Sequence, residues 1–402
     1  MNTTRNWQTP VLVVLCGGIL LGLSMGMRNV QSLFMLPMIS ERGWTREQFG
    51  LAIALQNIVW GLSQPLMGMI ADRFGSVRVL LAGSALYAVG LYLEATAGSI
   101  ASLNLGAGLL IGLALSGTAF ATVYGAVSRI AAPAQRSWAL GMTGAIGGLC
   151  QFAIVPITHG LMGALGWAAA LVVIALLFVA AAPTSFALQD QLQEPPAAGQ
   201  SMSSAIRAAF SHRGFWLLNA GFLACGFQLA FISNHLPAYL MDKGMQPGVA
   251  VTALAIILLT NIVGTYYCGY LGGKYSCKYL LSGLYLIRSA AIAAFIWLPI
   301  SPTTVYLFAA LMGLTWLGTV PLTNGIVSQV FGMKYLATLF GFVFFGHQLG
   351  AFFGVWLGAH MFDATHSYHA VWMIAIALGL LASLLHLPID DRQMDFAKPL
   401  AA

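Results

Sequence analysis

Long apolar stretches, separated by short polar segments, run along the whole chain. Each continues for about 20 residues or more, the length that an α-helix needs to cross a bilayer, whereas strands of an outer-membrane barrel would alternate apolar and polar residues over about ten positions. The pattern therefore predicts an all-α polytopic membrane protein. Its twelve helices are centred near Leu23, Val59, Val89, Gly117, Leu149, Val173, Gln228, Thr260, Arg288, Trp316, Gln348 and Leu378.

One connection between these helices is longer and more polar than the rest. It runs from about Gln189 to Arg213 and contains Glu194-Pro195-Pro196. Proline-rich polar segments of this kind separate structural units. We therefore expect an N-terminal six-helix bundle (1–188), a cytoplasmic linker (189–213) and a C-terminal six-helix bundle (214–402).

The two halves also share a sequence repeat. The second helix ends in GMIADRFGSVRVL, starting at Gly68, and the eighth ends in GYLGGKYSCKYLL, starting at Gly269, 201 residues later. Internal duplication, with a binding site between the halves, is typical of secondary transporters. The repeat therefore favours a pseudo-symmetric pair of bundles and a carrier function.

Charge is scarce and unevenly placed. Only 7% of the 402 residues are charged, against about 25% in soluble domains, which excludes a water-soluble globule. If the N-terminus is cytoplasmic, 12 of the 17 Lys and Arg residues lie inside and three lie outside. This asymmetry predicts that both termini are cytoplasmic. The net charge of +6 is then a topology signal and gives no reason to expect nucleic-acid binding.

The end of the second helix resembles a known family. Its Gly-x-x-x-Asp-Arg-x-Gly-x-x-Arg pattern is similar to the signature cytoplasmic loop of the major facilitator superfamily, whose acidic and basic residues form a cytoplasmic latch. A capped turn, with Asp72 at the start of the third helix, is the simpler alternative. The resemblance implies a cytoplasmic gate formed by Gly68, Asp72, Arg73, Gly75, Arg78, Arg136 and Lys274.

The first two helices narrow the resemblance. Residues 26–34 read GMRNVQSLF and residues 39–46 read ISERGWTR, which is similar to the monocarboxylate transporter group and its oxalate:formate antiporter relatives. Members of that group often carry a basic residue at the position of Arg28. They also carry a substrate-binding arginine in the eighth helix, where this chain has Thr265.

Two arginines, Arg28 and Arg288, lie within apolar spans. A charge in the hydrocarbon region costs about 2.5 to 3.5 kcal/mol on insertion scales, so it is retained where it lines a cavity or finds a partner. A guanidinium binds a carboxylate through two hydrogen bonds. No acidic residue is expected at the membrane centre, so the pair favours an anionic substrate. Snorkelling of Arg28 to the surface, and a bracing role for Arg288, are the alternatives.

Polar side chains at mid-depth in both halves predict a hydrated central cavity, although each alone is often glue between helices. The set consists of Gln56, Asn57, Gln151, Gln228, Asn261, His347 and Gln348. Histidine is the residue type that ordinarily changes charge near neutral pH, so His347 is the candidate for proton coupling. It lies beside a Gly346, Gly350, Gly354 face that permits close helix contact, so a packing histidine is the alternative.

Together these features predict a secondary transporter that moves a small organic anion by alternating access, with a monocarboxylate as the leading candidate. Coupling to protons or exchange is expected, in a cell membrane such as the bacterial inner membrane. We expect a monomer in the lipid bilayer with no enzymatic activity, cofactor, metal or nucleic-acid partner. A carrier of a neutral or aromatic metabolite, or of a drug, is the alternative. All candidate substrate-binding residues lie in the spans: Arg28, Asn57, Gln151, Gln228, Asn261, Arg288, His347 and Gln348.

Overall fold

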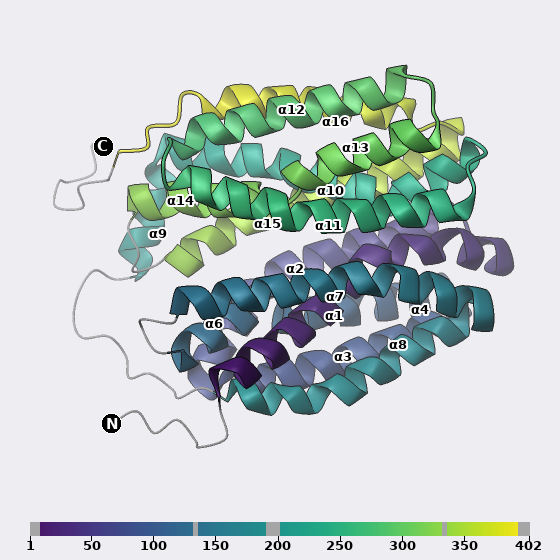
Figure 1. Ribbon diagram of the computed structural model, residues 1–402, viewed down its shortest axis with the longest axis horizontal. Coiled ribbons are helices and arrows are strands. Elements are labelled where there is room, and N and C mark those ends of the chain that lie inside the picture. Colours follow the sequence, from purple (N-terminus) through teal and green to yellow (C-terminus); the bar gives the residue numbers. More distant parts are fainter. Residues whose placement is uncertain (1–8, 132–135, 190–201, 332–335, 393–402) are drawn as a thin grey trace.

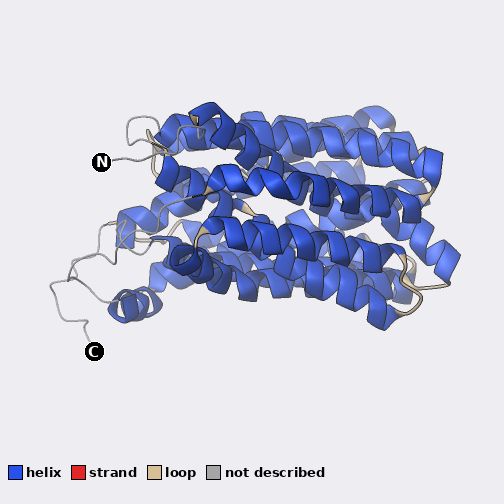
Figure 2. Cartoon of the chain, turned by 90° about the horizontal axis from the view of Figure 1, so that it is seen from below, coloured by secondary structure: helices blue, strands red, loops and turns tan. Residues whose placement is uncertain are grey.

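A computed structural model describes residues 9–131, 136–189, 202–331 and 336–392. Over these ranges the chain is helical, and none of the described residues forms a strand (Figure 2). Figure 1 shows two bundles packed one above the other, the first built from α1 to α8 and the second from α10 to α16. We call the end where α1 begins and α16 ends the terminal end, and the opposite end the distal end.

The N-terminal bundle contains six membrane-spanning units, of which two are composite. Its elements are α1 (Pro10–Arg42), α2 (Arg46–Phe74), α3 (Ser76–Ala95), α4 (Ile100–Leu103), the π-helix η1 (Asn104–Leu110), α5 (Ile111–Thr118), α6 (Phe120–Ile130), α7 (Arg136–Leu165), α8 (Trp167–Ala181) and the 3₁₀-helix η3 (Ala182–Leu188). The fourth span is formed by α4, η1, α5 and α6 in succession, and the sixth by α8 and η3.

The C-terminal bundle repeats this arrangement. The linker helix α9 (Met202–Ser211) precedes it, and its elements are α10 (Arg213–Asp242), α11 (Pro247–Gly272), α12 (Cys277–Trp297), α13 (Pro302–Thr315), α14 (Thr319–Phe331), α15 (Leu336–Thr365) and α16 (His369–His386). Eleven spans of the described chain are long and apolar enough to cross a membrane. The twelfth, α2, has 29 residues and carries more polar side chains. The prediction of two six-helix bundles is confirmed.

Helices come close together where small residues face a neighbouring helix. This is expected in lipid, because the hydrophobic effect does not drive helices together there and close packing does. The predicted glycine face of α15 is confirmed, because it packs on α10. A Cβ atom added at Gly350 would meet the backbone of Leu223, and one added at Gly354 would meet the backbone of Phe227. Each bundle has its own buried apolar core.

The fourth and tenth spans are broken at equivalent places. The backbone leaves the helix at Ala119, between α5 and α6, and again between α13 and α14. Beside the first break the Ser24 hydroxyl lies 2.7 Å from that of Thr118. Beside the second, the Cys225 sulfur lies 3.3 Å from the Thr319 hydroxyl. Both residues of the second pair stand 201 positions after the first, so the repeat extends into the helix breaks.

Two local expectations need correction. The linker is not wholly irregular, because residues 202–211 form the short helix α9. Asp72 does not occupy the N-cap of the third helix, because α2 continues to Phe74. The N-cap of α3 is Gly75, at a φ of 89° and without a side-chain hydrogen bond. Only glycine adopts this backbone conformation readily, which explains its place at the tight turn.

Candidate functional site

Arg28 lies on α1 and faces α2. Its Nη2 donates a hydrogen bond to Asn57 Oδ1 at 3.1 Å, and its guanidinium carbon lies 5.2 Å from the centre of the Trp60 ring. The Nε atom is buried and has no hydrogen-bond partner. No acidic side chain of the described residues pairs with this guanidinium. The group therefore keeps a donor and a positive charge that the protein does not satisfy.

Aromatic rings connect Arg28 to the other bundle. Trp60 packs edge-on against Phe344 of α15, with ring centres 5.2 Å apart, and Phe344 stacks on His347 at 5.7 Å. The ring nitrogen Nδ1 of His347 lies 2.9 Å from Gln348 Oε1. Gln348 also donates a long hydrogen bond of 3.5 Å to the Asn57 carbonyl. Asn57, His347 and Gln348 are thus brought together with Arg28 between the bundles.

A small pocket also lies between the bundles. It is lined by Asn29 of α1, Ser233 of α10, three apolar residues of α11 and Trp316, so both bundles contribute. The Asn29 side chain donates a hydrogen bond of 3.2 Å to Gln151 Oε1 on α7. Gln151 is therefore placed near the same interface as Arg28.

Arg288 has different surroundings. Its side chain is fully buried inside the C-terminal bundle. It donates hydrogen bonds to the carbonyls of Thr315 and Trp316, where α13 ends, and to Gln228 Oε1 and Cys225 Sγ at 3.3 Å each. The C-terminal end of a helix carries unsatisfied carbonyls and partial negative charge, which a cation stabilises. Arg288 thus holds the broken span, and a contact with substrate stays a prediction.

The other mid-depth side chains divide between the two bundles. Asn261 Oδ1 accepts a hydrogen bond of 3.0 Å from the backbone of Leu317, so it holds the same break as Arg288. Gln56 points the other way, into the N-terminal bundle, and donates to Gln31 Oε1 at 3.0 Å. The predicted ring therefore separates into an interface group (Asn57, Gln151, His347 and Gln348), a C-terminal group (Gln228 and Asn261) and Gln56.

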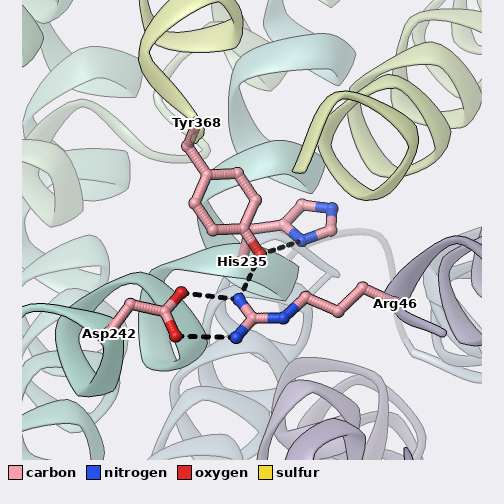
Figure 3. Close-up of polar contacts among 4 residues, drawn as sticks. All are labelled: Arg46, His235, Asp242 and Tyr368. Atoms are coloured by element: carbon pink, nitrogen blue, oxygen red, sulfur yellow. Dashed lines mark hydrogen bonds and ion pairs between the residues drawn. The ribbon is translucent and has the colours of Figure 1, made fainter. Parts of the chain in front are cut away.

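The distal end is closed by polar contacts between the bundles. Both Arg46 Nη atoms of α2 donate to the Asp242 carboxylate of α10, each at 2.7 Å, and Nη1 also donates to the Tyr368 hydroxyl at 2.8 Å (Figure 3). The Arg46 guanidinium lies 3.7 Å from the centre of the Phe362 ring. The Glu47 amide, next in sequence, donates to Asp363 at 2.6 Å.

A histidine supports this distal network. His235 Nε2 lies 2.8 Å from the Val355 carbonyl, which can only accept, so Nε2 donates. The neutral ring then offers Nδ1 as acceptor to the Tyr368 hydroxyl, at 3.4 Å (Figure 3). The sequence gives no local sign of the Arg46–Asp242 pairing, because the two residues lie 196 positions apart.

This architecture is that of a known protein family. The sequence profile of the Major Facilitator Superfamily matches residues 14–355. The chain belongs to the major facilitator superfamily. A crystal structure of a bacterial homologue of the human lysosomal transporter Spinster, inward-facing and unoccupied, has the same fold with a TM-score of 0.69. That structure is 17% identical, and the match covers 95% of this chain and 94% of the other.

Individual transporter sequences show a more specific similarity. Monocarboxylate transporter 13 of Bos taurus is 25% identical over 344 residues, which is 84% of this chain and 79% of the relative. The rat protein of the same name is 25% identical over 347 residues, 84% of this chain and 78% of the relative. A probable sulfoacetate transporter of Cupriavidus necator is 26% identical over 246 residues, 57% of each chain.

The superfamily loop motif is described only in part. The side chains of Asp72, Arg73 and Arg136 lie outside the described residues, as does Lys334, so the latch stays a prediction. Arg78 is exposed. Lys274 donates to the Tyr270 hydroxyl at 2.5 Å. Gly68 has no neighbour within 4 Å of a Cβ position.

The terminal end also holds a contact that sequence reasoning missed. Arg129, at the end of α6, donates a hydrogen bond of 2.7 Å to the Ser76 hydroxyl at the start of α3. The fourth span is thereby joined to the turn within the motif. The only signal in the sequence was a basic residue at a helix end.

Proposed function

We propose that this superfamily member carries a small organic anion by alternating access, and that a monocarboxylate is the leading candidate. The observation that supports it is Arg28, a permanently charged group near the bundle interface with one hydrogen bond to Asn57 and an unpaired Nε. A carboxylate would supply the missing acceptors and the counter-charge at once. Two named relatives are monocarboxylate transporters, and a third is a probable sulfoacetate transporter.

The proposed cycle alternates access between the two ends of the site. The Arg46–Asp242 pair and the Glu47–Asp363 contact join the bundles at the distal end, and these contacts must break for that end to open. The termini are proposed to be cytoplasmic, so the distal end would face outward. The broken spans, fixed by Ser24 and Thr118 in one bundle and by Arg288 and Asn261 in the other, would keep each bundle rigid while the bundles rock.

A neutral or aromatic substrate is the second candidate. The rings of Trp60, Phe344 and His347 form a continuous aromatic group beside Arg28. Such a surface binds flat apolar ligands without any charge pairing. In that case the charge of Arg28 would serve only the hydrogen bond to Asn57.

The test is ligand stabilisation of the purified protein, followed by counterflow in liposomes. Acetate, lactate, pyruvate and sulfoacetate are compared with neutral amides of similar size. A ligand at 100 times its Kd raises the free energy of unfolding by about 2.7 kcal/mol. We expect the anions alone to stabilise the wild type and to exchange in counterflow.

Two variants assign the effect to the guanidinium. Arg28→Ala removes hydrogen bonds to a charged group, about 1.5 to 3 kcal/mol, which lowers affinity by roughly 10- to 100-fold. Arg42→Ala is the matched control, because Arg42 is exposed at the distal end of the same helix and contacts Trp167. Stabilisation by the amides alone, or undiminished anion binding in Arg28→Ala, would refute the anion site.

A further inference from the structure

The N-terminal bundle contains an acidic side chain that the proposed transport site does not use. Glu94 is the second-last residue of α3 and is fully buried. Its Oε2 accepts one long hydrogen bond, 3.4 Å, from Gln31 Nε2 of α1, and its Oε1 has no partner. Ionised carboxylates in apolar surroundings need several donors or a cation, and neither is present among the described residues. The surroundings therefore suit a protonated carboxyl.

Two amides connect Glu94 to the Arg28 site. Gln31 lies one helical turn after Arg28 on α1, and its Oε1 accepts from Gln56 Nε2 at 3.0 Å. Gln56 is the neighbour of Asn57, the residue that accepts from Arg28. Helix α1 thus bears both Arg28 and the amide that contacts the carboxyl, and each of these two residues has a partner on α2. A movement of α1 against α2 changes both.

The backbone around the carboxyl has an unusual form. Gln56 also donates to the Ala107 carbonyl at 2.8 Å, within the π-helix η1. Its own Oε1 is buried without a partner. Short π-helical segments occur frequently at functional sites. Two orphan oxygens, on Glu94 and Gln56, therefore belong to one connected polar group in an otherwise apolar bundle.

Few other ionisable groups face this carboxyl. Tyr87, two turns before Glu94 on α3, is within electrostatic range of both Glu94 and Arg28. Its hydroxyl donates to the Ser24 carbonyl at 2.9 Å. The elements packed on this part of α3 contain no acid or base: α4, η1, α5 and α8. Arg28, on α1, is the cation that completes the charge balance.

We propose that Glu94 is the proton-binding site of the carrier, coupled through Gln31 and Gln56 to anion binding at Arg28. Loading transfers a proton from hydronium at the distal end to the Glu94 carboxylate, which forms one O–H bond and leaves water, and unloading breaks that bond and passes the proton to water at the terminal end. Thr96, two residues further along the chain, is exposed, so the distance from Glu94 to water is short. The proposal rests on the proposed anion transport.

Charge balance gives the coupling its direction. When neither the anion nor the proton is bound, the site holds one cation, Arg28, and one carboxylate, Glu94. Fully loaded, the anion neutralises Arg28 and the proton neutralises Glu94. Both forms are neutral overall, whereas binding of the anion alone or of the proton alone leaves one net charge in the membrane. Because uncompensated charge in the hydrocarbon region is costly, the neutral forms cross and the half-loaded forms do not.

The experiment uses purified full-length protein in liposomes, with the monoanions acetate and lactate as probes. Two signals are compared: counterflow exchange without a pH gradient, and concentrative uptake driven by acid outside. We expect Glu94→Gln to retain counterflow within about twofold of the wild type and to lose at least about tenfold of proton-driven uptake, which corresponds to 1.4 kcal/mol. The matched control is Glu41→Gln, which removes a distal acid whose carboxylate accepts a hydrogen bond from Trp167.

The outcomes separate this proposal from the function on which it rests. If the wild type shows no counterflow with any anion, the proposed function fails. If Glu94→Gln concentrates the probes as well as the wild type does, the proton site is wrong while the function stands. Infrared difference spectra of the wild type and Glu94→Gln provide a readout without transport. The spectrum should contain a protonated carboxyl C=O band that only Glu94→Gln lacks, and its absence from the wild type would overturn the proposal.

Discussion

The contact that closes the distal end can be tested with a single substitution. Asp242→Asn removes the charge that binds both Nη atoms of Arg46 at 2.7 Å while it preserves side-chain size. The Arg46 side chain is 9% exposed and that of Asp242 is 32% exposed, so solvent screens part of the interaction. A hydrogen bond to a charged group contributes about 1.5 to 3 kcal/mol, and asparagine can still accept one. We therefore expect the closed form to lose about 2 kcal/mol.

That loss corresponds to a shift of roughly thirtyfold toward the distally open form. Spin labels report it at Gly98→Cys and Ala364→Cys, two exposed distal positions, one on each bundle, in a background without native cysteines. A Cβ at Gly98 has no neighbour within 4 Å, so labelling there disturbs no packing. Double electron–electron resonance should show a longer distance component in Asp242→Asn that is weak in the parent protein.

The control is Glu41→Gln, because Glu41 accepts from Trp167 of the same bundle and joins nothing across the interface. Its distance distribution should match the parent. A double variant that combines Asp242→Asn with Arg46→Gln should open no further than the single variant, because the two residues act as one pair. An unchanged distribution in Asp242→Asn, or an equal opening in the control, would refute the role of this pair.

Four further substitutions test other parts of the structure in detergent unfolding experiments. Arg288→Met leaves two buried carbonyls without donors and should lower the free energy of unfolding by about 3 kcal/mol. Gly350→Ala should lower it by about 1 to 3 kcal/mol through overpacking between α10 and α15, whereas Gly283→Ala, with no neighbour within 4 Å of its Cβ, should raise it by about 0.5 to 1 kcal/mol. Burial raises the pKa of Asp391, but a hydrogen bond from Ser276 and a nearby ammonium group outweigh burial and hold that pKa below its usual value. The resulting stabilisation exists above the unfolded pKa of about 3.9 and disappears as the pH falls through the folded pKa, so Asp391→Asn should lower Tm at neutral pH and match the wild type in acid.

The fold could be predicted because a membrane leaves few choices. Apolar length fixes each span, and the repeat near Gly68 and Gly269 fixes the two bundles. The breaks at Ala119 and after Thr315 were missed because a broken span has the same hydropathy as a continuous one. The helix α9 was missed because its ten residues lie within a connection that reads as polar.

The site could be predicted only as a set of residue types. Depth along a helix treats Gln56 and Asn57 alike, but adjacent residues on a helix point about 100° apart, so one faces the interface and the other the bundle interior. The burial of Glu94 likewise depends on the packing of α1 and η1 over the end of α3. Contacts of this kind depend on tertiary structure, which hydropathy does not encode.

The repeat separates structural residues from functional ones. Two pairs of positions 201 residues apart have the same structural role. Ser24 is equivalent to Cys225 and Thr118 to Thr319, and each half uses its two residues to stabilise a helix break. Tyr87 and Arg288 are also equivalent. The Tyr87 hydroxyl donates to the Ser24 carbonyl, and the Arg288 guanidinium donates to the Cys225 sulfur. The charge of Arg288 thus follows from its structural task. Arg28 and Glu94 have Leu229 and Phe295 as their equivalents. Apolar residues suffice at these positions for the fold, so the polar groups of the N-terminal half are retained for another reason, which binding an anion and a proton would supply.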